Sequence, residues 1–157
     1  MARVRVLLDS TYVLPAFGIA VRELSREDLL KLEELRRCGA VEYCYSNVMW
    51  VEVVPKVVKE HLRNGRSLDF RLVERAVEAL HELFSEVEPG PRAICEAFKL
   101  RSLGHVDMVD NILYGIAIEN DMHLLSMDCH LREFLKRHGL RFELIVDHHK
   151  LFSKISF

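Results

Sequence analysis

The sequence predicts an α/β protein with a mainly parallel sheet that is covered by helices on both faces. Short apolar or aromatic segments, which suit strands, alternate along the chain with segments whose apolar residues recur at helical spacing. This alternation is typical of strands joined by crossover helices. Glycines close several of the helical segments, and the chain contains no internal repeat and no linker.

The first strand is predicted at Val4 to Leu8, where arginine alternates with valine before the segment becomes wholly apolar and ends at Asp9. A second strand is predicted at Val41 to Tyr45, which is apolar and aromatic. Two further strands are predicted at 124–127 and 142–146. All four segments are short enough for strands of a central sheet.

The clearest helix signal lies at 25–37, where Ser25 and Asp28 resemble a capping box and Gly39 is a natural stop. A helix also begins at Ser46, and Pro55 should kink or divide it because proline lacks the amide hydrogen. Further helices are predicted at 72–84, at 92–103 before Gly104, at 107–119, and at 129–138 before Gly139.

The length of 157 residues suits one domain, 1–157. A boundary at Pro89-Gly90-Pro91 would leave fragments of about 90 and 65 residues, and the smaller would be marginal alone. Half of the residues are hydrophobic and 29% are charged, as in soluble globular proteins. No apolar run approaches the roughly 20 residues of a membrane span, and the N-terminus is interpreted as a strand, so a cytoplasmic protein is expected.

The four cysteines form no CxxC pair, so no zinc knuckle or dithiol motif is visible and reduced thiols are expected. The net charge of −2 gives no overall positive field toward nucleic acid. Residues 1–128 hold 16 basic against 21 acidic residues, whereas 129–157 hold 6 against 3. This distribution fits a metal site beside a phosphate contact, and it also fits ordinary surface variation.

Four acidic residues stand out by position: Asp9, Glu52, Asp110 and Asp128. Each lies near the end of a predicted strand or the start of a predicted helix, and ligands of parallel sheets bind beyond the carboxyl ends of the strands. Clustered carboxylates repel one another, which a divalent cation relieves. Oxygen ligands without cysteine select hard ions, so Mg²⁺ or Mn²⁺ is expected, and such ions support phosphodiester hydrolysis.

Helical spacing places Asp110 at the margin of an apolar stripe, from which its carboxylate can reach a cleft. Asp107 falls further toward solvent and is expected to be exposed or supporting. Each acid also has an ordinary interpretation: Asp9 as a turn residue, Asp107, Asp110 and Asp128 as helix caps, and Glu52 as a solvated helix residue.

These acids, in VLLDST, SNVMWVE, DNILYGIA and LLSMD, resemble the four-acid pattern of PIN-domain ribonucleases, which include VapC toxins of toxin–antitoxin pairs. The match spans nearly the whole chain. The resemblance implies a flavodoxin-like, three-layer α/β/α sandwich and a metal-dependent endoribonuclease in which Asp9, Glu52, Asp110 and Asp128 hold metal. It implies that Ser126 steadies metal or water. It also implies an RNA substrate, frequent homodimers and, for toxins, an inhibitory antitoxin.

Two alternatives remain open. One is a PIN-like module that binds RNA or a partner protein without cleavage. The other is a phosphatase of the haloacid dehalogenase type, which requires Asp-x-Asp after the first strand, whereas this chain has Asp9-Ser10-Thr11. Asp147-His148-His149 invites a metal-site interpretation, but adjacent histidines near a terminus are expected to be surface residues. Arg132, Lys136 and Arg137 form either a solvated face or an RNA contact, and Trp50 is expected to be core.

Overall fold

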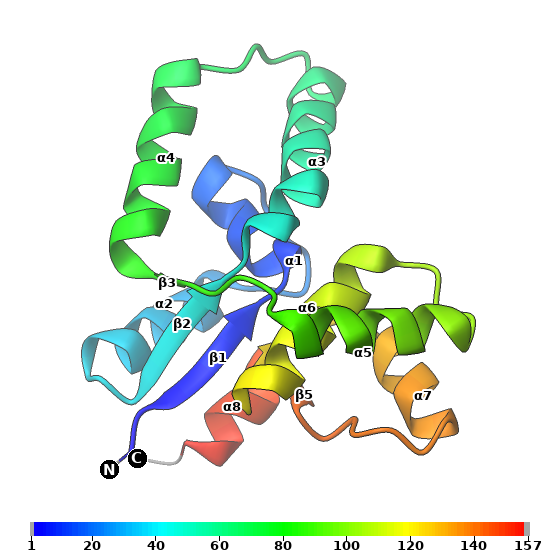
Figure 1. Ribbon diagram of the computed structural model, residues 1–157. Helices are drawn as coiled ribbons and strands as arrows, with labels where there is room; N and C mark the ends of the chain where they lie inside the picture. Colours follow the sequence, from blue (N-terminus) through cyan, green and yellow to red (C-terminus); the bar gives the residue numbers. More distant parts are fainter. Residues whose placement is uncertain (1, 156–157) are drawn as a thin grey trace.

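The computed structural model describes residues 2–155 as a five-stranded sheet with helices on both sides (Figure 1). The strand order is β3-β2-β1-β4-β5, and all four strand pairs are parallel. The strands are β1 (Val4–Leu8), β2 (Val41–Tyr45), β3 (Ser85–Glu86), β4 (His123–Leu125) and β5 (Ile145–Val146). The predicted three-layer α/β/α architecture with a parallel sheet is therefore confirmed.

Helices connect successive strands. They are α1 (Ser10–Val13), α2 (Arg26–Arg37), α3 (Trp50–Arg63), α4 (Phe70–Leu83), α5 (Pro91–Ser102), α6 (Met108–Asn120), α7 (Cys129–Arg137) and α8 (His148–Lys154), with 3₁₀ turns at Leu14–Phe17 and Asn47–Met49. The predicted capping box of α2 is present, because Ser25 and Asp28 exchange side-chain-to-backbone hydrogen bonds. No described helix has the length and apolar character needed to cross a bilayer.

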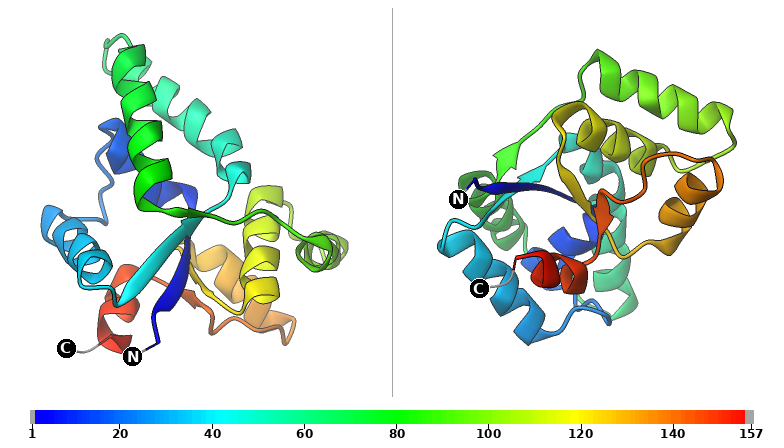
Figure 2. Two further views of the ribbon diagram at one scale, coloured as in Figure 1. Left: turned by 60° about the vertical axis from the view of Figure 1, so that its left-hand side comes forward. Right: turned by 90° about the horizontal axis from the view of Figure 1, so that it is seen from below.

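The alternation of side chains along β1 divides the core into two layers. Val6 and Leu8 face a core that α1, α2, α3, α4 and α8 complete, whereas Leu7 faces a core built from α5, α6 and α7. The two views of Figure 2 show these helices on opposite sides of the sheet. Because the strands are parallel, their carboxyl ends lie at a common edge, where the connecting loops can gather polar residues.

Helices α3 and α4 form an antiparallel pair that projects away from the sheet (Figure 1). Its apolar face is only partly covered: the side chains of Leu62 and Phe70 are 70% and 76% exposed. Pro55 does not divide α3. The amide that Pro55 lacks would have donated to the carbonyl of Val51, and both residues lie on the exposed side of the helix, where water can replace that bond.

The structure corrects several predicted boundaries. The last strand covers only Ile145–Val146 instead of 142–146, and β4 begins one residue earlier and ends at Leu125. The two-residue strand β3 and the helix α8 were not predicted. His148 was predicted to be a surface residue and is buried, whereas His149 is exposed as expected. Trp50 is half-buried against the core. Within residues 2–155 all four cysteines are free.

Candidate active site

Asp9 follows β1 directly and forms the N-cap of α1, where its carboxylate accepts a hydrogen bond from the Thr11 amide at 3.0 Å. Its own amide donates to the Leu125 carbonyl at 3.1 Å, which ties the end of β1 to the end of β4. The residue is only 7% exposed. The sheet thus fixes the backbone of Asp9, and the helix N-terminus fixes its carboxylate.

Glu52 lies in the first turn of α3. It contacts Ser10, the residue that follows Asp9. The Ser10 hydroxyl donates to Glu52 Oε2 at 2.5 Å, and Lys56 Nζ donates to Ser10 Oγ at 3.1 Å. Lys56 Nζ is also 3.7 Å from Glu52 Oε2, one helical turn away. The Glu52 carboxylate is therefore held by a serine from α1 and a lysine from its own helix.

Asp110 lies in the first turn of α6 and is 9% exposed. The Asp107 carboxylate caps this helix by accepting a hydrogen bond from the Asp110 amide at 3.1 Å. Asp107 itself is exposed, as predicted for a supporting residue. The cap thus fixes the backbone at the start of α6, where Asp110 lies.

Asp128 is the N-cap of α7, where its carboxylate accepts from the His130 amide at 2.8 Å. Ser126 is buried, and its Oγ accepts a hydrogen bond from the Asp128 amide at 3.1 Å. The Ser126 amide donates to the Val146 carbonyl at 2.9 Å, so the residue lies where β4 and β5 end.

The electrostatics show that the four acids share one region. Burial raises the pKa of Asp9 to about 6, although hydrogen bonds from Ser126 and from two backbone amides oppose the shift. Burial also raises the pKa of Asp110 far above its usual range, and repulsion from Asp107, Asp128, Asp9 and Glu52 adds to it. Like charges shift one another only when they lie close together. Asp110 therefore lies within electrostatic range of Asp9, Glu52 and Asp128.

The spacing within the acidic cluster is open. Among residues 2–155, no three of its carboxylates place one oxygen each within 4.8 Å of one another; the group that does so is Asp28, His148 and His149. Mg²⁺ commonly keeps several waters and binds directly to only one or two carboxylates. An all-oxygen set of this spacing, with two carboxyl groups whose ionisation is suppressed by burial and repulsion, fits a hydrated hard cation.

Three residues near the acids were missed by the sequence analysis. Ser10 and Lys56 position Glu52, and only their spacings from acids, one and four residues, could have indicated them. The buried Asn111 donates to the His105 carbonyl at 3.0 Å, and its side-chain oxygen is 2.6 Å from His105 Nδ1. Asn111 thereby holds the loop before α6, from which Asp107 caps the helix of Asp110.

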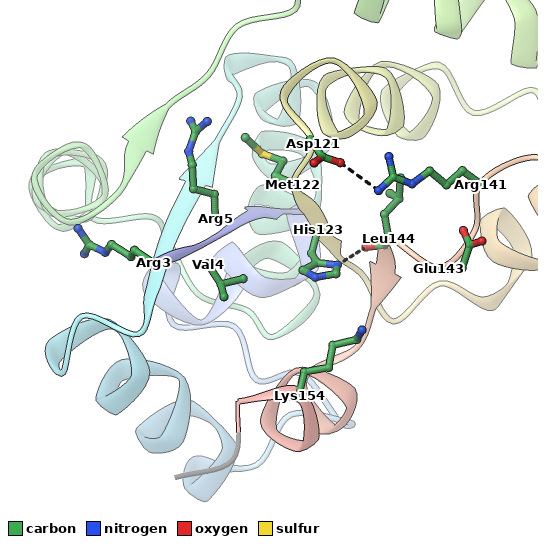
Figure 3. A pocket seen from close by; sticks show the side chains of 10 residues that line it. All are labelled: Arg3, Val4, Arg5, Asp121, Met122, His123, Arg141, Glu143, Leu144 and Lys154. Atoms are coloured by element: carbon green, nitrogen blue, oxygen red, sulfur yellow. Dashed lines mark hydrogen bonds and ion pairs between the residues drawn. The ribbon is translucent and has the colours of Figure 1, made fainter. Parts of the chain in front are cut away.

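A cavity of about 420 Å³ lies at the opposite edge of the sheet, near the amino ends of β1 and β4 (Figure 3). Arg3, Arg5, Arg141 and Lys154 contribute basic groups, and Arg141 is paired with Asp121 at 3.0 Å. Asp9 and Asp128 follow the carboxyl ends of the same strands, so this cavity is separated from the acids by the length of the sheet. It is not part of the candidate active site.

Neither the family models nor the curated proteins searched gave a match to the chain. Solved structures do match. A chain of VapBC2 from Rickettsia felis, bound to a promoter DNA fragment, aligns over 92% of this chain and 98% of its own, with a TM-score of 0.64 and 12% identity. A chain of VapBC-1 from nontypeable Haemophilus influenzae aligns over 93% and 99%, with a TM-score of 0.63 and 14% identity.

A third match, PAE2754 from Pyrobaculum aerophilum, aligns over 96% of this chain and 88% of its own, with a TM-score of 0.59 and 16% identity. At such identities the likeness concerns the fold, and it extends over nearly the whole length of each chain. The protein therefore has a PIN-like α/β/α fold, which is the fold that the sequence resemblance implied.

Proposed function

We propose that the protein is a metal-dependent endoribonuclease that hydrolyses RNA phosphodiester bonds, with Asp9, Glu52, Asp110 and Asp128 holding Mg²⁺ or Mn²⁺. The observation that carries the proposal is the repulsion that raises the pKa of Asp110. It comes in part from Asp9, Glu52 and Asp128, which belong to three other parts of the fold. All four lie at helix N-termini on the carboxyl edge of a parallel sheet. That edge is where ligands of such sheets bind.

The chemistry divides between the cation and the side chains. When bound, the cation supplies Lewis acidity toward the attacking water and the phosphate oxygens. The raised pKa of Asp110 means that the metal-free site retains a proton near neutral pH, which cation binding must release. Ser126 and Asp107 fix the backbone that carries Asp128 and Asp110, so that the carboxylates keep their positions as charge develops.

A role as the toxin of a toxin–antitoxin pair is part of this proposal. Two of the structures with the same fold are VapBC complexes, one of which is bound to promoter DNA. The exposed apolar side chains of the α3–α4 pair give a partner protein a surface to cover, either an antitoxin or a second copy of this chain. Light scattering after size-exclusion chromatography, with and without the product of an adjacent reading frame, tests both partners.

Cleavage of a broad panel of RNAs in Mn²⁺ tests the proposed activity. The wild-type protein should cleave, EDTA should stop it, and Asp9→Asn and Asp110→Asn should each reduce the rate by at least about a hundredfold. Asp69→Asn is the matched control, because Asp69 caps the exposed start of α4 and asparagine caps equally well. Unchanged cleavage in both site variants would reject the assigned residues.

The alternative is a PIN-like module that binds RNA or protein without cutting. It predicts RNA retention on a filter by pure protein that shows no cleavage in either Mg²⁺ or Mn²⁺. The presence of all four acids, two of them buried, favours the nuclease over this module.

A further inference from the structure

A second group of metal-ligating side chains lies between α2 and α8, which run beside each other (Figure 2). Asp28 comes from the first turn of α2, whereas His148 and His149 open α8. One ligand atom from each residue lies within 4.8 Å of those of the other two. None of these three residues is one of the four acids of the candidate active site.

His148 provides an observation that is independent of this proximity. The residue is 2% exposed, and within the described chain its buried Nε2 has no hydrogen-bond partner. The nearest acceptor, Asp28 Oδ2, is 3.6 Å away, which is beyond a hydrogen bond. Buried ring nitrogens are normally satisfied. An ion that bridges Nε2 and the Asp28 carboxylate would give Nε2 a partner.

The other ring nitrogen of His148 is already held. Nδ1 lies 2.9 Å from the hydroxyl oxygen of Tyr12, and the same oxygen accepts the backbone amide of His148 at 3.2 Å. A phenolic oxygen can accept both bonds, so Nδ1 can carry the proton and leave the lone pair on Nε2. This is the arrangement found around metal-bound histidines, whose second nitrogen donates to a fixed acceptor.

The protonation states of His148 and Asp28 without metal also suit metal ligands. Burial lowers the pKa of His148, which favours the neutral imidazole that metals bind. Hydrogen bonds from the Ser25 hydroxyl and amide lower the pKa of Asp28, so its carboxylate is ionised. His149 is exposed and gives an ion a path from solvent.

We propose that Asp28, His148 and His149 form a second metal site, which binds a borderline transition cation such as Zn²⁺. Two imidazoles and one carboxylate are ligands that Zn²⁺ accepts, with a fourth position left for water. The all-oxygen acidic cluster prefers harder ions, so the two sites should differ in selectivity. The bound ion would link α8 to α2. These helices already contact each other through Lys31, whose Nζ lies 5.6 Å from the centroid of the Phe152 ring.

Cobalt is the probe for this site, because Co²⁺ substitutes for Zn²⁺ and gives strong visible absorption when four-coordinate. The full chain is freed of metal with a chelator and titrated with Co²⁺. Wild-type protein should bind one Co²⁺ with this absorption, and Zn²⁺ should displace it and raise the Tm. His149→Ala and Asp28→Asn should each weaken binding by at least tenfold. Tyr12→Phe, which removes the acceptor of His148 Nδ1, should weaken it by about tenfold.

Two controls separate this site from the proposed nuclease site. His138→Ala removes the exposed histidine that follows α7 as its C-cap, and this variant should bind Co²⁺ as the wild type does. Asp110→Asn should also keep the visible absorption, whereas His149→Ala should keep any Mn²⁺-dependent cleavage. Loss of absorption in Asp110→Asn, or wild-type binding by His149→Ala with an unchanged metal-free Tm, would overturn the site. The binding readout needs no RNA cleavage, so failure of the nuclease proposal leaves it intact.

Discussion

Ser10 and Glu52, 42 residues apart in the sequence, are joined by a hydrogen bond of 2.5 Å from the serine hydroxyl to Oε2 of the glutamate. Ser10 is buried at the start of α1, directly after Asp9, so this bond couples the end of β1 to the first turn of α3. Lys56 donates to the same serine oxygen. The contact therefore sets the position of Glu52 relative to Asp9.

Ser10→Ala should slow RNA cleavage by about 10- to 100-fold, because a hydrogen bond to a charged group contributes about 1.5–3 kcal/mol. The loss should appear mainly in kcat, since Ser10 positions a carboxylate and does not contact substrate. Thr11→Ala is the control, as the Thr11 side chain makes no described hydrogen bond to the acids. Equal rates for the two variants would contradict the positioning role.

Asp110→Asn should stabilise the metal-free protein at neutral pH while it removes activity. Burial and repulsion from four acids raise the pKa of Asp110, so its ionised form is disfavoured in the folded state. Each unit of this shift corresponds to about 1.4 kcal/mol, and an amide avoids that penalty. Chemical denaturation in EDTA should show a gain above about 1 kcal/mol. The exposed Asp69→Asn should show almost none, and a loss in Asp110→Asn would speak against the account.

The stability of metal-free protein should fall as pH rises from about 4 through 6. The folded-state pKa of Asp9, about 6, lies above the ordinary value of 3.8, so the folded state binds more protons in this window. Stability therefore decreases with pH, by about 3 kcal/mol for a shift of this size. Asp9→Asn should flatten the profile, and so should saturating Mn²⁺. A rise of stability across this window that Asp9→Asn abolishes would reverse the assigned sign.

Gly115→Ala should destabilise the protein, although this change normally favours a helix by about 1 kcal/mol. An added Cβ at Gly115 would lie 2.1 Å from the backbone carbonyl oxygen of Ala93, so α5 and α6 would have to separate. Overpacking of this kind costs about 1–3 kcal/mol. Thermal denaturation of the variant should give a lower Tm. A Tm above that of the wild type would show that the two helices pack less closely.

Much of the fold could be predicted because the local signals agree with the tertiary ones. Val4–Leu8 and Val41–Tyr45 each end in three buried apolar or aromatic residues, and the start of α2 carries its own capping box. The positions of the acids followed from the same reasoning, since strand ends and helix starts can be located in the sequence. Their expected proximity came from the resemblance, together with the rule for parallel sheets.

The parts that were missed depend on contacts between distant residues. The strand β3 has two residues and exists because Tyr45 and Cys44 pair with it. His148 is buried against Tyr12, which lies 136 residues earlier in the sequence. The Tyr12 hydroxyl is hydrogen-bonded to both the amide and the Nδ1 ring nitrogen of His148. No periodicity in residues 147–155 carries that information. Ser10 and Lys56 are likewise recognisable only once Glu52 lies beside them.

Calorimetry of Mn²⁺ binding tests most directly whether the four acids share one cation. It compares the wild-type protein with variants in which the acid is replaced by its amide, at Asp9, Glu52, Asp110 or Asp128. His149→Ala serves as the common background, so that the second site does not contribute. The account predicts Mn²⁺ binding in this background and a loss of at least tenfold in affinity for Asp9→Asn and Asp110→Asn. Affinity that is unchanged in both variants, with their folds intact, would contradict it.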